Sequence, residues 1–206
     1  MTPKASARAR LISEGIRLFR DQGYHGTGIQ QIALSAGIPK GSFNFYFASK
    51  EALATAVIAE YGNAIAQGLL AYGARTDLSP GERLTAYFSD MMSELEGSGF
   101  AHGCTIGNLL AEIGDVNERL RKDLQTAWNR IADALTHLVA EAEANGEMSL
   151  PTSAEIIACH LLTGWEGALI AMRAEQSVQP MARFVALSLK PLMAANANTN
   201  SHQGVA

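Results

Sequence analysis

The stretch Thr27–Lys50, TGIQQIALSAGIPKGSFNFYFASK, predicts two short helices joined by a tight turn. Ile29, Ile32 and Ala33 repeat with the spacing of a buried helix face. Thr27 stands where it can cap the start of this first helix. We expect the rest of the chain to be organised around this hairpin.

The second half of the hairpin carries the signals of a sharp turn followed by a helix. Gly37 suits a turn residue with positive φ, and Pro39 suits the first turn of the next helix. Phe43, Tyr46 and Phe47 give this second helix a face to bury. The pattern is typical of a helix-turn-helix, although spacing alone also fits a plain helical hairpin in an all-α protein.

The charge of the chain is divided between its two ends. Residues 1–50 carry seven Lys/Arg against two Asp/Glu, a net charge of +5, and the remainder carries nine against eighteen, a net charge of −9. A basic head on an acidic body indicates a protein that binds a polyanion at one end. The residues left to face outward on the second helix suit base edges or phosphates: Lys40, Gly41, Ser42 and Asn44.

These residues resemble the TetR family of transcriptional repressors. The resemblance rests on Thr27–Ala33, Ala36–Ile38, Lys40–Phe43 and Tyr46–Leu53, and so covers the first quarter of the chain. Asn44 departs from the Tyr that the family usually has, which bears on the operator sequence and not on the DNA-binding role.

The resemblance implies a homodimer that binds double-stranded operator DNA of pseudo-palindromic sequence and is released by a small-molecule inducer. In the family pattern, Thr27, Tyr46 and Lys50 hold phosphates, whereas the second helix of the hairpin meets base edges. The expected DNA contacts are Thr27, Lys40, Gly41, Ser42, Asn44, Tyr46 and Lys50.

The composition of the 206 residues, 48% hydrophobic and 17% charged, predicts a folded protein. We find no apolar run near the ~20 residues that cross a bilayer, and no secretory signal at the N-terminus. The two cysteines show no metal or disulfide spacing. We therefore expect a cytoplasmic protein with reduced thiols.

The sequence predicts an all-α fold. We expect a three-helix helix-turn-helix head at residues 1–48, a helical ligand-binding and dimerisation body at 49–195, and a disordered tail at 196–206. Besides the hairpin, the expected helices are Ser6–Gln22, Lys50–Tyr72, Ser79–Glu96, Gly103–Gly114, Asn117–Asn145, Thr152–Ala174 and Val178–Ala194.

The last two helices are unusually apolar, and a four-helix bundle made from two subunits would bury them. They could instead fill the core of a monomer. The residues expected at the dimer interface are Ile157, Leu161, Trp165, Met181, Phe184 and Leu192.

A ligand cavity in the body is implied by the family resemblance, since Met and aromatic residues at helical spacing are more often plain core. The residues expected to line it are Phe88, Met91, Met92, Leu95, Phe100, Cys104, Leu109, Trp128, Ile131 and Trp165.

Cys104 follows a broken helix end, so it could lie at a helix N-terminus where N–H groups stabilise a thiolate. The pattern Gly103, Cys104, Leu109, Ala111, Glu112, Ile113 is similar to the NemR-like branch of the family, whose members respond to electrophiles or oxidants through cysteine. Cys104 is thus a possible sensor, the alternative being a small thiol that packs in the core or lines the cavity.

An enzyme is not expected. The histidines have no metal-ligand spacing, and no Ser/His/Asp set or Gly-rich phosphate loop is found, so the sequence predicts no metal and no cofactor. The alternative to a repressor is a helical small-molecule-binding protein or enzyme without a DNA role.

Overall fold

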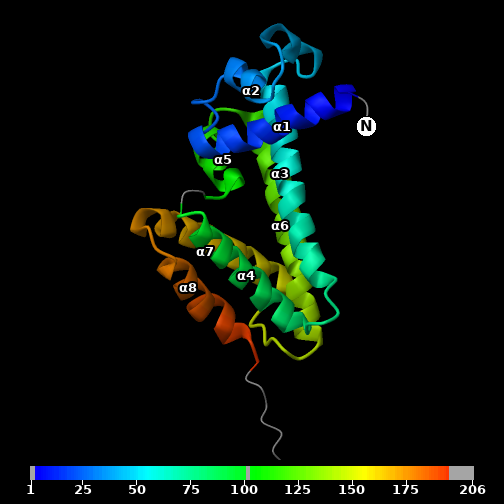
Figure 1. Cartoon of the computed structure of the whole chain (residues 1–206). Helices are drawn as coiled ribbons and strands as arrows, with labels where there is room; N and C mark the ends of the chain where they lie inside the picture. Colours follow the sequence, from blue (N-terminus) through cyan, green and yellow to red (C-terminus); the bar gives the residue numbers. More distant parts are fainter. Residues whose placement is uncertain (1–2, 101–102, 195–206) are drawn as a thin grey trace, which may run out of the picture.

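A computed structural model describes residues 3–100 and 103–194, with the side chains of residues 3–5 and of Lys40 left out. Within these ranges the chain is helical, apart from an isolated β-bridge between Met148 and Met193. The expected all-α fold is confirmed (Figure 1). The predicted tail, residues 196–206, and His102 lie outside the described residues.

Helix α1 (Pro3–Gln22) begins the head and buries an apolar stripe that includes Leu11, Leu18 and Phe19. It ends at Gly23, which takes a positive φ of 75°. α1 approaches α3 closely at Gly15, where an added Cβ would lie 2.7 Å from Cγ2 of Val57.

The hairpin consists of α2 (Ile29–Ser35) and η1 (Lys40–Phe45), a 3₁₀-helix. Gly37 between them has a φ of 64°, as a tight turn requires. The prediction that Thr27 caps the first helix is wrong, because Gly28 is the N-cap. The hydroxyl of Thr27 instead donates to the carbonyl oxygen of Gly23 at 2.7 Å, closing the end of α1.

α3 (Lys50–Gly73) leads from the head into the body, and Ser49 caps it by accepting from the N–H of Ala52 at 3.1 Å. It runs alongside α6 (Glu118–Ala144) over most of its length (Figure 1). Gly62 permits the close approach, since an added Cβ would lie 2.7 Å from Cβ of Ala127. The helix that joins the head to the body is thus packed on α6.

The remaining helices enclose the lower body. α4 (Pro80–Gly97) starts with a capping box, in which the side chains of Ser79 and Glu82 each accept a hydrogen bond from the other residue's backbone N–H. α5 (Thr105–Ile113) is short and passes below α1, and α7 (Ala154–Glu175) packs on α6 (Figure 1).

The chain end departs from the single helix expected over residues 178–194. α8 (Gln179–Phe184) is followed by a π-helical turn, η2 (Val185–Leu189), and a 3₁₀ turn, η3 (Lys190–Leu192). Pro191 accounts for the change, because it has no N–H and its ring clashes with the carbonyl four residues earlier. The chain then pairs with the α6–α7 loop, where the N–H of Ser149 donates to the carbonyl of Leu192 at 2.9 Å.

The expected dimer residues require a correction. Five of them are buried within a single chain, at 0–6% exposure: Ile157, Leu161, Trp165, Met181 and Phe184. The sixth, Leu192, is partly buried and packs against the same core. The sequence pattern identified an apolar stripe but assigned it to the wrong partner, since α6, α4 and α8 already cover it.

The opposite face of α7 is exposed and partly apolar, with Ile156 and Ile170 at 58% and 68% exposure. By length and composition alone α7 could cross a membrane, which corrects the expectation that no segment qualifies, although core helices of soluble proteins pass the same test. Its buried stripe packs against α6 and α8, as in a core helix.

Candidate functional site

The outer surface of η1 presents the polar residues expected to contact DNA. Gly41 and Asn44 are exposed and Ser42 is half-buried, whereas the side chain of Lys40 is outside the described set. Phe45 is 76% exposed on the same segment, and the sequence reasoning missed it. An exposed aromatic among buried ones was the available signal, since Phe43 and Phe47 are both buried.

Thr27 is not available as a phosphate ligand. Its side chain is 1% exposed and its hydroxyl donates to backbone carbonyls of Gly23 and Leu18. The predicted phosphate contact of this side chain is therefore wrong. Tyr46 is half-buried and packs against the core, so its hydroxyl role stays a prediction.

Lys50 lies over the ring of Tyr24, with Nζ 4.2 Å from the ring centroid. Partial burial lowers the pKa of Lys50, and the nearby charge of Glu112 acts in the opposite direction. The side chain thus leans toward the loop between α1 and α2. Its role as a phosphate anchor stays a prediction.

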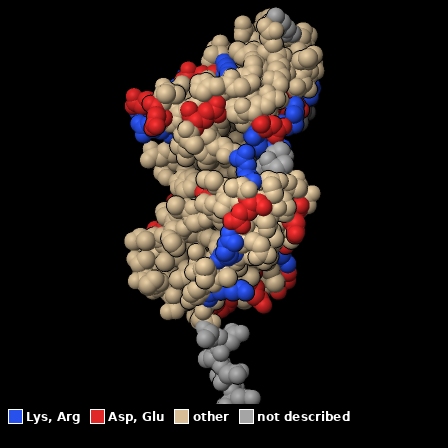
Figure 2. All heavy atoms as spheres, turned by 90° about the vertical axis from the view of Figure 1, so that its left-hand side faces the viewer, with Lys and Arg blue, Asp and Glu red and all other residues tan. Residues whose placement is uncertain are grey.

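Several basic residues of the head have partners within the chain. Nε of Arg10 donates to the carbonyl of Ala36 at 2.9 Å, and the guanidinium of Arg8 lies 5.0 Å from the centroid of the Phe47 ring. Figure 2 shows acidic and basic side chains interspersed on the visible face, with large uncharged areas at the head end.

The head and body are joined by Glu112 near the end of α5. Its carboxylate accepts from the backbone N–H of Tyr24 at 2.7 Å and from that of His25 at 2.6 Å. These N–H groups lie in the loop that follows α1. The sequence reasoning used Glu112 only as part of a motif.

A cavity of about 330 Å³ opens between α3, α4, α5, α6 and α7. Most of its wall is apolar. Trp165 and Phe88 line it with ring centroids 4.9 Å apart, and the ring of Phe184 packs against both, at 5.6 Å and 5.4 Å. Tyr87 meets Phe88 edge-on at 5.4 Å. This aromatic wall would face the flat part of a small ligand.

The cavity contains six of the ten residues expected to line it: Phe88, Met91, Leu95, Cys104, Ile131 and Trp165. The other four do not line it. Leu109 is fully buried core, while Met92, Phe100 and Trp128 pack against the core elsewhere.

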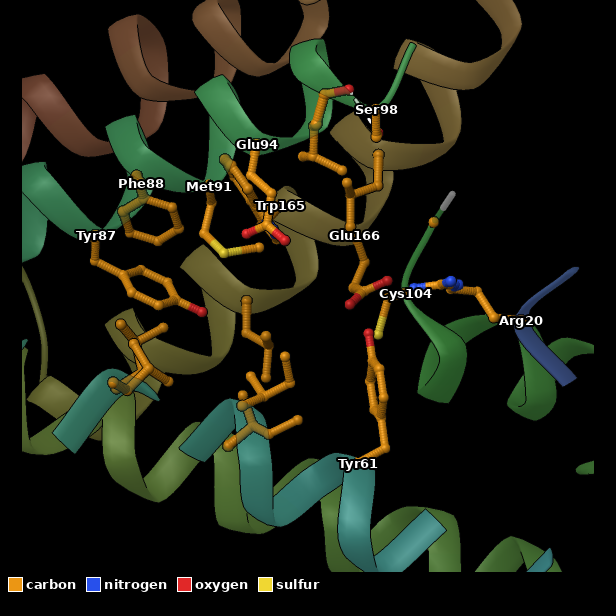
Figure 3. Close-up of a pocket in the computed structure, with 18 residues that line it drawn as sticks. Arg20, Tyr61, Tyr87, Phe88, Met91, Glu94, Ser98, Cys104, Trp165 and Glu166 are labelled. Atoms are coloured by element: carbon orange, nitrogen blue, oxygen red, sulfur yellow. Dashed lines mark hydrogen bonds between the residues drawn. The ribbon is translucent and has the colours of Figure 1, made fainter. Parts of the chain in front are cut away.

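The polar end of the cavity was missed apart from Cys104. Figure 3 shows Arg20, Tyr61, Cys104 and Glu166 converging there, opposite Tyr87 and Phe88. Arg20 belongs to α1, so no spacing in the sequence brings it to the body. Glu166 could have been noticed as an acidic residue within an apolar helical stretch.

Cys104 is the N-cap of α5, as expected, but its thiol is not set up as a thiolate. Burial, and then the neighbouring charge of Glu166, raise the pKa of Cys104 above its usual value, outweighing the N–H groups of Ile106 and Gly107. The thiol lies beside the Glu166 carboxylate. The expected lowering of the thiol pKa is therefore wrong.

Comparison with known proteins agrees with this architecture. The family described as "Bacterial regulatory proteins, tetR family" matches residues 11–57, and "Tetracyclin repressor-like, C-terminal domain" matches residues 80–187. The chain therefore belongs to the TetR family of bacterial transcriptional regulators, with an N-terminal DNA-binding helix-turn-helix.

The chain is similar over most of its length to individual members. It is 25% identical to the HTH-type transcriptional repressor DhaR of Mycobacterium sp., over 96% of this chain and 98% of that protein. It is 31% identical to the transcriptional regulator AcuR of Cereibacter sphaeroides, over 88% of this chain and 84% of that protein. The crystal structure of reduced NemR from E. coli superposes with a TM-score of 0.83 at 25% identity, and the match covers 93% of this chain and 99% of that one.

Proposed function

We propose that this protein is a homodimeric repressor that binds a pseudo-palindromic operator and is released by a small molecule that fills the cavity. Residues 1–48 would bind DNA and residues 49–195 would bind ligand and partner subunit. Similarity to proteins named as transcriptional repressors supports the direction of control. Such a regulator would act in the cytoplasm.

The observation that carries the proposal is the composition of the cavity wall. The cavity is formed mainly by body helices, yet Arg20 of the DNA-binding head also lines it. A ligand there would touch both parts of the molecule at once. Its binding can therefore favour one position of the head over another.

The proposed dimer face is the exposed side of α7. Its residues recur every three or four positions and so share one helix face: Ile156, His160, Thr163, Gly167 and Ile170, all exposed in the single chain. Leu187, 75% exposed in η2, would extend the apolar area. Pairing two such faces around a two-fold axis would present two heads to adjacent major grooves.

Release by modification of Cys104 is the second route that the sequence suggested. Burial and the charge of Glu166 raise the pKa of this thiol, and this favours a reversible ligand instead. Operator-bound protein treated with a small thiol-reactive electrophile separates the two routes. Release that Cys104→Ser abolishes and Cys159→Ser leaves intact would establish the covalent route.

DNA binding is tested with purified protein and genomic fragments selected by retention on it. We expect the recovered sites to be pseudo-palindromic, and affinity to fall steeply with salt because phosphate contacts release counterions. Affinity that is absent at low salt would favour the alternative, a helical small-molecule-binding protein without a DNA role.

A further inference from the structure

Two side chains of opposite charge line the polar end of the cavity without pairing with each other. Arg20 comes from α1 in the head and Glu166 from α7 in the body (Figure 3). Among the described residues, no ion pair joins them. Both therefore keep hydrogen-bonding capacity directed at the same space.

Arg20 is incompletely satisfied. Its Nε is buried and has no hydrogen-bond partner among the described residues. The Oδ1 atom of Asp21 lies 3.5 Å away, which gives an ion pair without a hydrogen bond. Because Nε has almost no accessible surface, an acceptor in the cavity would meet the terminal nitrogens of this guanidinium, whose side chain is 34% exposed.

Glu166 is held against the start of α5. An added Cβ at Gly107 would lie 2.7 Å from its Oε2, so the carboxylate occupies the space that this glycine leaves free. Its neighbour is the thiol of Cys104, which carries a single proton for a group with two oxygens. Burial raises the pKa of Glu166, as expected for a carboxyl that lacks strong donors.

We propose that the inducer is a small molecule with an apolar, ring-sized body and a polar end that carries a hydrogen-bond acceptor beside a donor, as in an α-amino acid or a primary amide. The acceptor would meet Arg20 and the donor Glu166. The body would lie along Trp165 and Phe88. A cavity of about 330 Å³ is at the small end of ligand sites, which fits a molecule of this size.

This inference rests on the proposed function and adds a mechanism to it. A ligand that bridges Arg20 and Glu166 ties α1 of the head to α7 of the body. The head is then favoured in the one position that permits both contacts. If that position of the head differs from the DNA-bound position, the ligand weakens DNA binding. The factor is set by the ratio of the ligand's affinities for the two positions of the head.

Other ligand types satisfy fewer of these groups. A purely apolar molecule would fill the aromatic end but would add no hydrogen-bond partner for Arg20 or Glu166. A simple amine would pair with Glu166 and face the guanidinium of Arg20 unfavourably. A simple carboxylate would pair with Arg20 and be repelled by the carboxylate of Glu166. A polar end that carries both an acceptor and a donor is the one that can bind both side chains.

The binding test uses a matched set of probes and measures Trp165 fluorescence in a Trp128→Phe background, without DNA. Phenylalanine and phenylacetamide carry both functions, phenylacetate only the acceptor, phenethylamine only the donor, and propylbenzene neither. We expect the two-function probes to bind at least about tenfold more tightly than the others, because each adds one more charge-assisted hydrogen bond. The proposal is overturned if neither two-function probe binds, or if both bind no more tightly than the one-function probes and propylbenzene.

The variants test the two named groups separately. Arg20→Gln and Glu166→Gln should each weaken the preferred probe about tenfold or more, and Arg20→Lys should fall short of wild type because it loses the planar fork. Two controls should bind like wild type: Arg17→Gln, on the exposed side of α1, and Glu155→Gln, at an exposed site of α7 that does not line the cavity. Unchanged binding in both Arg20→Gln and Glu166→Gln would overturn the bridge.

A separate arm measures operator binding by fluorescence anisotropy with and without the preferred probe. If the protein binds the probe but never binds DNA, the repressor proposal fails and the ligand assignment stands. If it binds DNA but the probe series shows no preference for two functions, the ligand assignment fails and the repressor proposal stands. Probe-induced release that Arg20→Gln reduces and Arg17→Gln retains supports both.

Discussion

The carboxylate of Glu112 accepts a 2.7 Å hydrogen bond from the backbone N–H of Tyr24, 88 positions earlier in the chain. Tyr24 lies just after α1 of the head, and Glu112 lies near the end of α5, whose N-cap is Cys104 of the cavity. One short helix thus touches the cavity at its start and the head at its end. A shift of α5 would be transmitted directly to the α1–α2 loop.

Replacing Glu112 by Ala should loosen this connection. Two backbone N–H groups lose a charged acceptor, and we expect the free energy of unfolding to fall by about 1–3 kcal/mol. Urea denaturation measures the loss, and hydrogen exchange should speed up selectively at Tyr24 and His25. Glu60→Ala, at an exposed site within α3, is the control and should change stability by less than about 0.5 kcal/mol. Unaltered exchange at both amides would show that the contact does not hold the loop.

The head makes a prediction about DNA readout. Asn44→Ala should change which operator sequence is preferred, because the exposed Asn44 can reach base edges. Lys50→Ala should weaken binding to operator and random DNA about equally, as loss of a phosphate contact does. Competition assays with both DNAs measure the two effects. If Lys50→Ala changed preference and left overall affinity intact, its anchor role would be wrong.

Thr27 provides a contrasting case in the same assay. Thr27→Val removes a buried hydroxyl that donates to Gly23, so we expect lower stability, by about 1 kcal/mol, with operator affinity retained. A selective loss of operator affinity at full stability would instead restore the phosphate role that the sequence suggested.

Much of the helix pattern was predictable because its signals are local. Ser49, the Ser79–Glu82 capping box and Gly23 each fix a helix end through neighbouring backbone groups. The last helix was misjudged because the widening before Pro191 depends on how a proline ring is accommodated, which apolar spacing does not report.

The sites were less predictable because they depend on contacts between distant segments. The cavity was expected only from the family resemblance, and two of its polar residues come from distant segments, Arg20 from the head and Glu166 from α7. The apolar stripe of α7 was recognised, yet spacing cannot say whether a stripe meets its own chain or a second copy. The burial of Leu161 decided that question.

The dimer face makes a prediction that separates the two stripes of α7. Ile170→Glu places a carboxylate on the exposed face, so the monomer should fold and the dimer should dissociate. Leu161→Glu places one in the core of the single chain, so unfolding is expected. Analytical ultracentrifugation and far-UV circular dichroism distinguish these results. A stable dimer of Ile170→Glu would move the interface elsewhere.

The final prediction concerns the reactivity of Cys104. Burial and the charge of Glu166 raise the pKa of this thiol, so the neutral form persists at pH values where an ordinary cysteine is already thiolate. In a Cys159→Ser background, iodoacetamide should therefore alkylate Cys104 at least about tenfold more slowly than free cysteine at pH 8, with a rate still rising above pH 9. Mass spectrometry of timed samples measures the rate.

Glu166→Gln tests the cause. It removes the negative charge beside the thiol, which lowers the pKa of Cys104 toward its usual value and increases the thiolate fraction at pH 8. Alkylation should accelerate, whereas Glu94→Gln at the cavity rim should leave the rate unchanged. A wild-type rate that levels off near neutral pH would contradict this and would mean that the N-terminus of α5 does hold a thiolate, as a covalent sensor requires.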